Sequence, residues 1–156
     1  MKINQKGKGN DNFETPIYIY NQLNEVYNFT LDVACTSINK KCVEGYMFDK
    51  GLDSLLLSWK NERCFCNPPF SQKAEFIRKA HDEVLGNGCP LCVMILPLNS
   101  MDSKAFHEYI FGKFSYEILQ GRISFVDPCT GRPKKGNNSG SVIVYFKKRI
   151  RIKNEN

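Results

Sequence analysis

A run of six apolar residues, 91–96, constrains the fold of this 156-residue chain more than any other feature. It is too short to cross a bilayer, and its unbroken apolar character is typical of a strand buried on both faces. A sheet of such strands needs a helix layer on each side. The segment just before the run predicts one of these helices, because apolar side chains repeat there at helical spacing: Phe76, Ile77, Ala80 and Val84.

The rest of the chain alternates in the same way between strand and helix patterns. We expect helices that begin at Thr15 as N-cap, at Ser71 and at Asp102, and a short helix over 53–59. The expected strands are 29–34, 63–66, 91–96, 116–119, 122–126 and 141–150. The last two are expected to pair across a loop at 127–140. The pattern predicts an α/β fold on a mostly parallel sheet with a terminal antiparallel hairpin.

The charge is concentrated at the two ends of the chain. The net charge is +6, and residues 1–10 and 147–156 together carry +7, which leaves −1 for residues 11–146. We expect a flexible basic arm at 1–12, one domain at 13–150 and a basic tail at 151–156. Two basic ends on a nearly neutral body suit attraction to nucleic acid, although they would also serve solubility alone.

Seven cysteines, an odd number spread over strand-like segments, favour reduced thiols in an intracellular protein without a membrane span. One pattern allows another interpretation. Cys64-x-Cys66 and Cys89-x-x-Cys92 together offer four zinc ligands. Cys64 and Cys66 alternate on one side of an expected strand, so we favour core thiols and expect no metal site.

The tetrapeptide Asn67-Pro68-Pro69-Phe70 directly follows the expected strand 63–66, at the edge of the sheet where ligands gather. Two prolines stiffen the turn and leave the carbonyls before them aimed outward. The Asn67 side chain and the Pro68 carbonyl can then accept both hydrogens of one amino group. This exposes the lone pair of the amine to an electrophilic methyl group, and Phe70 offers a flat face for the ring that carries the amine. An ordinary turn is the other interpretation of the motif.

Other short motifs occur in order around this tetrapeptide. They are Glu14-Thr15-Pro16, Leu31-Asp32-Val33-Ala34 with Asn39, Asp53 with Trp59, Gly121-Arg122-Ile123-Ser124-Phe125, and Gly140-Ser141. Together with Asn67-Pro68-Pro69-Phe70, which matches the motif of amino-group methyltransferases, the set resembles the small phage-type DNA N6-adenine methyltransferases over about residues 13–146. The resemblance implies a Rossmann-like methyltransferase fold, S-adenosylmethionine as methyl donor, adenine in DNA as acceptor, and the cytoplasm of a bacterial cell or phage-infected host.

The same resemblance assigns cofactor contacts, each with a structural alternative. Asp32 would hold the ammonium group of the cofactor, or cap a turn, and Asp53 would accept from its adenine amino group, or cap the helix 53–59. Thr15 and Pro16 either contact the cofactor or only begin a helix. Ala34 and Asn39 complete the expected pocket, although the Gly-x-Gly loop common in broader methyltransferases is absent from this stretch.

DNA contacts are expected from basic residues near the loop and the tail, with the target base flipped out of the duplex. They are Arg122, Arg132, Lys134, Lys135, Arg151 and Lys153. Arg122 would bind phosphate or the cofactor carboxylate, or form a surface ion pair. A methyltransferase acting on cytosine N4, RNA or a protein glutamine amide, and an inactive nucleic-acid-binding module of the same fold, remain alternatives.

Overall fold

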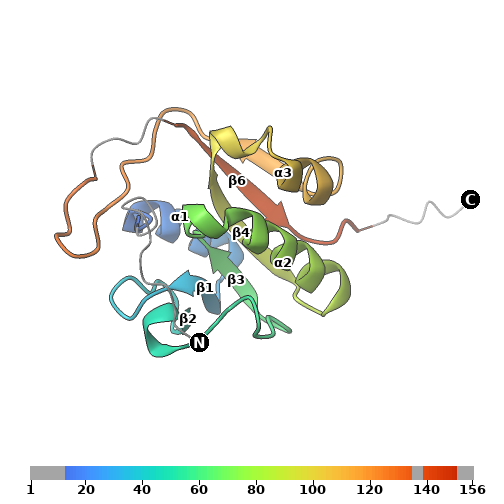
Figure 1. Ribbon diagram of the computed structural model, residues 1–156, viewed down its shortest axis with the longest axis horizontal. Helices are drawn as coiled ribbons and strands as arrows, with labels where there is room; N and C mark the ends of the chain where they lie inside the picture. The colour runs from blue at the N-terminus through green and yellow to red at the C-terminus, as the bar shows by residue number, and fades with distance from the viewer. Residues whose placement is uncertain (1–12, 135–138, 151–156) are drawn as a thin grey trace, which may run out of the picture.

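The computed structural model describes residues 13–134 and 139–150. In this part of the chain a six-stranded sheet has the order β2-β1-β3-β4-β6-β5 (Figure 1). The strands are β1 (Leu31–Cys35), β2 (Glu44–Met47), β3 (Arg63–Cys66), β4 (Leu91–Pro97), β5 (Ser115–Ile118) and β6 (Ser141–Phe146). Neighbours from β2 to β4 are parallel, whereas β6 runs antiparallel to both β4 and β5. The predicted α/β fold with an antiparallel pair at the end is confirmed.

Helices cover both faces of this sheet. The helices are α1 (Ile17–Tyr27), α2 (Lys73–Gly86) and α3 (Lys104–Tyr109), with the short 3-10 turns η1 (Phe48–Lys50), η2 (Phe70–Gln72) and η3 (Leu98–Ser100). Helices α2 and α3 contribute to one buried cluster and α1 to another, so they lie on opposite faces (Figure 1). Within the described ranges, no helix has the length and apolar character needed to span a bilayer.

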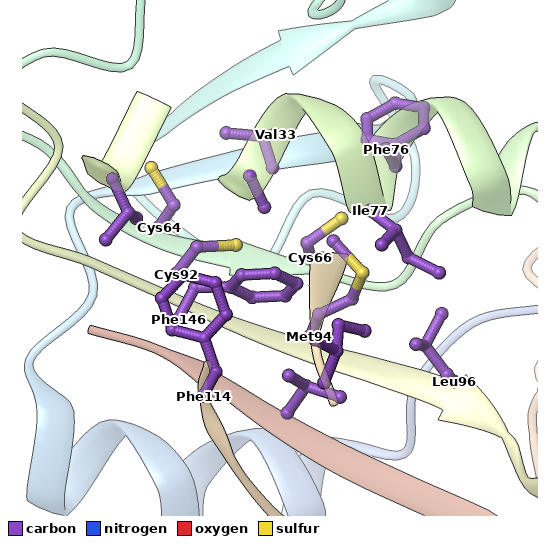
Figure 2. Close-up of a cluster of buried hydrophobic side chains, with 14 of the residues drawn as sticks. Val33, Cys64, Cys66, Phe76, Ile77, Cys92, Met94, Leu96, Phe114 and Phe146 are labelled. Carbon is purple, nitrogen blue, oxygen red and sulfur yellow. The ribbon is translucent and has the colours of Figure 1, made fainter. Parts of the chain in front are cut away.

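The core beneath α2 contains cysteines among large apolar side chains. Cys64, Cys66 and Cys92 point into it together with Phe76 and Phe146 (Figure 2). Burial raises the pKa of the Cys66 and Cys92 thiols, which keeps these thiols protonated. Cys64 and Cys66 lie on the same side of β3, as expected from their alternation, and they behave as small core residues.

Three helix starts differ from the sequence prediction. Helix α1 begins at Ile17 with Pro16 in the cap position, and the Thr15 side chain forms no cap hydrogen bond. Helix α2 begins at Lys73 rather than Ser71, because η2 precedes it. Ser103, not Asp102, caps α3 and accepts a hydrogen bond from Phe106 N at 3.2 Å. The Thr15 hydroxyl is therefore not used by the helix that follows it.

The predicted pairing of 122–126 with the final strand is wrong. Strand β6 instead lies between β4 and β5, and only Val126 of segment 122–126 forms isolated bridges. The side chains of Ile123 and Phe125 alternate as in a strand because they pack into the α1-side cluster. Residues 53–59 form turns rather than the expected helix, and the segment 36–52 contains β2, which was not predicted.

The connections around β1 create a crevice at one edge of the sheet. From β1 the chain passes to β2 on one side, and the next strand, β3, lies on the other side of β1. Strand β1 pairs with β3 only as far as Asp32, which is opposite Phe65. Parallel sheets bind ligands where the strand order reverses in this way, beyond the carboxyl ends of the strands. The fold therefore places the candidate site between β1 and β3.

Candidate active site

A pocket that opens to solvent lies at this reversal of the strand order. It is lined by residues from the segment before α1, from β1 and the turn after it, and from the end of β3. These residues are Phe13, Glu14, Thr15, Asp32, Ala34, Cys35, Thr36, Asn39, Lys41, Phe48, Phe65, Asn67 and Pro69. Predicted cofactor residues (Thr15, Asp32, Ala34 and Asn39) thus meet predicted catalytic residues (Asn67 and Pro69) in one pocket.

Asp32 provides a buried carboxylate in the pocket wall. Its oxygens accept hydrogen bonds from Ala34 N at 3.2 Å and from Lys41 N at 3.0 Å. Burial raises the pKa of Asp32 to about 6, because these two backbone donors offset only part of the desolvation. Each carboxylate oxygen can accept more than one hydrogen bond, so Asp32 retains capacity for a donor from a ligand.

Two threonine hydroxyls in the pocket wall are buried without a hydrogen-bond partner in the described residues. They are Thr15 Oγ1 and Thr36 Oγ1. Nearby, Asn39 Oδ1 accepts from Thr36 N at 2.6 Å and fixes the turn that follows β1. A buried hydroxyl without a partner costs free energy, and such groups in native proteins call for an explanation. A ligand with polar atoms in this pocket would provide one.

An ion pair between Lys41 and Glu14 lies in the same pocket and was not predicted. The Lys41 ammonium donates to a carboxylate oxygen of Glu14, and the two side chains are only 9% and 20% exposed. Among the residues that line this pocket, Lys41 is the cationic one. The pocket therefore contains a carboxylate at Asp32 and an ammonium group at Lys41. The two residues are connected by the hydrogen bond from the backbone N–H of Lys41 to the Asp32 carboxylate.

Asn67 stands directly after β3 at the rim of the pocket, as predicted. Its side-chain nitrogen donates a hydrogen bond of 2.7 Å to the main-chain carbonyl of Phe13. This bond uses one of the two amide hydrogens and fixes which end of the amide faces Phe13, so the side-chain oxygen lies at the other end of the group. Pro68 is buried, Pro69 lines the pocket, and the half-buried Phe70 ring meets the Phe13 ring edge-on at 5.5 Å.

Two predicted cofactor residues do not line this pocket. Pro16 is buried at the start of α1, where its carbonyl accepts from Ile19 N and Tyr20 N. Asp53 is exposed, and its carboxylate accepts from Leu55 N at 3.0 Å within a turn. Pro16 thus has the structural alternative given for it, the start of a helix. Asp53 caps a turn and not the expected helix, because residues 53–59 form turns.

The segment expected to be a loop at 127–140 contains an ordered part, which we call hairpin 125–134. Lys134 N donates to Phe125 O at 2.7 Å, Asp127 N donates to Arg132 O at 2.9 Å, and Gly131 makes the turn with φ +67°. Arg122 and Arg132 are exposed, whereas Lys134 is half-buried with its ammonium 4.2 Å from the centre of the Phe13 ring. Lys135, Arg151 and Lys153, the remaining predicted DNA contacts, lie outside the described residues.

The fold and the Asn-Pro-Pro-Phe turn beside this pocket are those of an α/β methyltransferase. The chain belongs to the DNA N-6-adenine-methyltransferase (Dam) family, whose family model matches residues 2–154. The family predicted from the motifs is therefore confirmed.

Two phage relatives support this membership at modest identity. The chain is 28% identical over 149 residues to a DNA N-6-adenine-methyltransferase of Haemophilus phage HP1 (strain HP1c1), a match covering 93% of this chain and 83% of that protein. It is 27% identical over 154 residues to a DNA N-6-adenine-methyltransferase of Escherichia phage T1, which covers 88% of this chain and 63% of that longer protein.

Proposed function

We propose that the protein transfers a methyl group from S-adenosylmethionine to the N6 amino group of adenine in DNA. The observation that carries this proposal is the shared pocket, which Asn67 of the amino-group motif lines together with Asp32 and two threonine hydroxyls that lack a partner among residues 13–134 and 139–150. Membership of the family supports the choice of adenine over cytosine. The names of the two phage relatives agree with DNA as the substrate.

The polar groups of the pocket fit the amino-acid end of the cofactor. Its ammonium group needs an anionic acceptor, which Asp32 supplies, and its carboxylate needs a cation, which Lys41 supplies. The buried hydroxyls of Thr15 and Thr36 would gain the hydrogen bonds that they lack. Phe48 and Phe65 give the pocket apolar walls for the adenosine part.

Binding of the cofactor carboxylate to Lys41 would replace an interaction within the protein. In the structure the Glu14 carboxylate pairs with the Lys41 ammonium. A cofactor carboxylate offers the same charge and the same acceptor geometry, so Lys41 keeps a partner in either state. If Lys41 binds the carboxylate of the cofactor, Lys41→Met should not change the affinity for methylthioadenosine, because this compound lacks the amino-acid end.

Asn67 and Pro68 act on the acceptor in this proposal. The Asn67 side-chain oxygen and the Pro68 carbonyl accept the two hydrogens of the adenine amino group and free its lone pair. Phe70 contacts the face of the adenine ring. The bound cofactor supplies a methyl group on a positively charged sulfur. No side chain needs to act as a base before transfer, because the amine loses its proton only after the new N–C bond has formed.

The target adenine must leave the duplex to reach Asn67, so we infer base flipping. Arg122, Arg132 and Lys134, on and beside hairpin 125–134, are the described cations that we assign to the DNA backbone. Lys135, Arg151 and Lys153 are assigned the same role from the sequence. Phosphate contacts of this kind position the duplex and make the affinity dependent on salt.

Mass analysis of nucleosides tests the proposal most directly. DNA from cells that express the protein should contain N6-methyladenine above the level in cells that express Asn67→Ala. Purified protein should also bind S-adenosylhomocysteine in a calorimeter. If the modified nucleoside is N4-methylcytosine, the acceptor is cytosine and not adenine. If methylation is confined to RNA or protein, the acceptor is not DNA. DNA binding without any methylated product would instead identify an inactive binding module.

A further inference from the structure

Phe13, the first described residue, holds the side chain of Asn67 although 54 positions separate the two in sequence. The main-chain carbonyl of Phe13 accepts the hydrogen bond from Asn67 Nδ2 at 2.7 Å. An amide group carries its donor and its acceptor on opposite sides. With the donor tied to Phe13, the Asn67 oxygen has one orientation, directed away from Phe13.

The ring of Phe13 contacts both the Asn67–Phe70 motif and hairpin 125–134. It meets Phe70 edge-on at 5.5 Å and stacks with Phe125 at 5.8 Å. The Lys134 ammonium lies 4.2 Å from the ring centre, within the distance typical of a cation–π interaction. One residue therefore contacts both the motif that meets the acceptor base and the hairpin that carries cations.

Main-chain hydrogen bonds connect the segment that contains Phe13 to hairpin 125–134. Glu14 N donates to Val126 O and Val126 N donates to Glu14 O, both at 2.9 Å. The hairpin continues this ladder on its other side through Lys134 N and Phe125 O. A displacement of the hairpin would therefore displace the backbone at 13–14, and with it the carbonyl that holds Asn67.

We propose that Phe13 is a positioning residue, which fixes the Asn67 amide through its carbonyl and couples it through its ring to hairpin 125–134. DNA that binds at the hairpin then affects the orientation of the Asn67 side chain through Phe13. The inference rests on the proposed function, because it takes Asn67 as the group that meets the acceptor amine. It gives Lys134 two partners, the Phe13 ring and the DNA backbone.

Steady-state kinetics with two variants and two controls test the coupling. Phe13→Leu should lower kcat at saturating DNA and cofactor by about tenfold or more, because a displaced acceptor group loses transition-state geometry. Its affinity for S-adenosylhomocysteine should stay within about threefold of the wild type. Phe13→Tyr keeps the ring and should restore kcat. Phe29→Leu removes an aromatic side chain from the same cluster without contacting Asn67, and should leave kcat unchanged.

Lys134→Met separates the two roles of Lys134. A residue that only binds phosphate changes KM for DNA, whereas one that also holds Phe13 lowers kcat at saturating DNA. We expect both effects for Lys134→Met, and only the change in KM for the matched control Arg132→Met. Lys134 is only half-buried, so this variant keeps the inference testable even if Phe13→Leu does not fold.

A spectroscopic measurement tests the hydrogen bond without reference to activity. The side-chain amide signal of Asn67 is identified by its loss from the NMR spectrum of Asn67→Ala. In the wild type its protons should exchange slowly with water, and in Phe13→Leu they should exchange faster. Equal exchange, an unchanged kcat in Phe13→Leu, or an equal loss of kcat in Phe29→Leu would each overturn the inference. A wild type that methylates nothing would refute the proposed function, while the amide signal would still report on the bond.

Discussion

Two buried carboxylates, Glu83 on α2 and Asp32 on β1, are each 2% exposed but have different surroundings. Glu83 accepts hydrogen bonds from Lys79 Nζ at 2.7 Å, Trp59 N at 2.9 Å and Asn87 Nδ2 at 3.2 Å. Asp32 accepts two hydrogen bonds, both from backbone N–H groups, and the nearby Lys41 ammonium is paired with Glu14 instead.

The pKa values follow from this difference. Burial opposes the charge of Glu83, but its three donors outweigh that effect and lower its pKa. Burial dominates at Asp32 and raises its pKa to about 6. The hydroxyls differ in the same way, because Ser54 Oγ accepts from the Trp59 indole N–H, whereas the hydroxyls of Thr15 and Thr36 have no partner among the described residues. Fully partnered polar groups stabilise the core beneath α2. Of the three buried side-chain hydroxyls without a partner among the described residues, two line the pocket where we expect the cofactor, and the third, Ser100, lies in η3.

The largest effect is expected from Glu83→Ala. It removes the partner of Lys79 and leaves the Trp59 N–H buried without an acceptor, which should cost about 3–5 kcal/mol of the free energy of unfolding. Asp82→Ala is the matched control, since it removes an exposed carboxylate from the adjacent position of α2. Urea denaturation should separate the two variants. Equal stability would mean that the Glu83 network contributes little.

Asn67→Ala is expected to act on the reaction and not on the fold. Loss of one acceptor for the amine should lower kcat by about 100-fold or more, in line with about 3 kcal/mol for one preorganised group. Affinity for S-adenosylhomocysteine should stay within a few-fold. Asn21→Ala on the exposed face of α1 serves as the control. Near-normal turnover in Asn67→Ala would reduce the tetrapeptide to an ordinary turn.

The sequence could predict those features of the fold and the site that are marked by a pattern of neighbouring residues. Strand β3 has the predicted bounds and β4 extends one residue beyond them, because continuous apolar runs mark buried strands. Asn67 was predicted at the pocket because its motif directly follows such a run. Strand β2 was missed, since Glu44–Met47 is a short edge strand with neither an apolar run nor alternation.

The remaining features depend on contacts between distant segments. The Lys41–Glu14 pair joins residues 27 positions apart, and the Phe13–Asn67 hydrogen bond spans 54. Neither has a local pattern that distinguishes it from other charged or amide side chains. The alternation of Ile123 and Phe125 was read as strand pairing because packing against α1 produces the same spacing.

Cofactor affinity should depend on pH through Asp32. The ammonium group of the cofactor needs the ionised carboxylate, and a pKa of about 6 in the free protein means that Asp32 is largely protonated at pH 5. Affinity for S-adenosylhomocysteine should therefore rise about tenfold from pH 5 to pH 7 and then level off. The same shift opposes folding, because the folded state increasingly disfavours the charged carboxylate as the pH rises from the ordinary value of 3.8 to about 6.

Asp32→Asn should bind more weakly than the wild type at pH 7 and show a flat profile. The charged neighbours Lys40, Lys41 and Glu14 remain in this variant, so a slope that persists would show that Asp32 is not the group responsible for the pH dependence. Calorimetry at several pH values in buffers of different ionisation enthalpy also counts the protons released on binding. Asp32 should release about one proton per ligand at pH 5.

The smallest effect is expected from the removal of single hydroxyls, where the sign of the change in stability is the informative result. Thr15→Val and Thr36→Val each remove a buried hydroxyl that has no partner in the described part of the chain, so the protein without ligand should keep its stability or gain up to about 1 kcal/mol. Ser54→Ala removes a hydroxyl that accepts from Trp59 Nε1 at 3.1 Å, and should lose about 0.5–1 kcal/mol. With saturating S-adenosylhomocysteine the order should reverse, because the threonine variants lose a ligand contact and Ser54→Ala keeps the full gain in thermal stability from binding. Threonine variants that lose stability without ligand would show that these hydroxyls already have partners, and the distinction between the core and the pocket would fail.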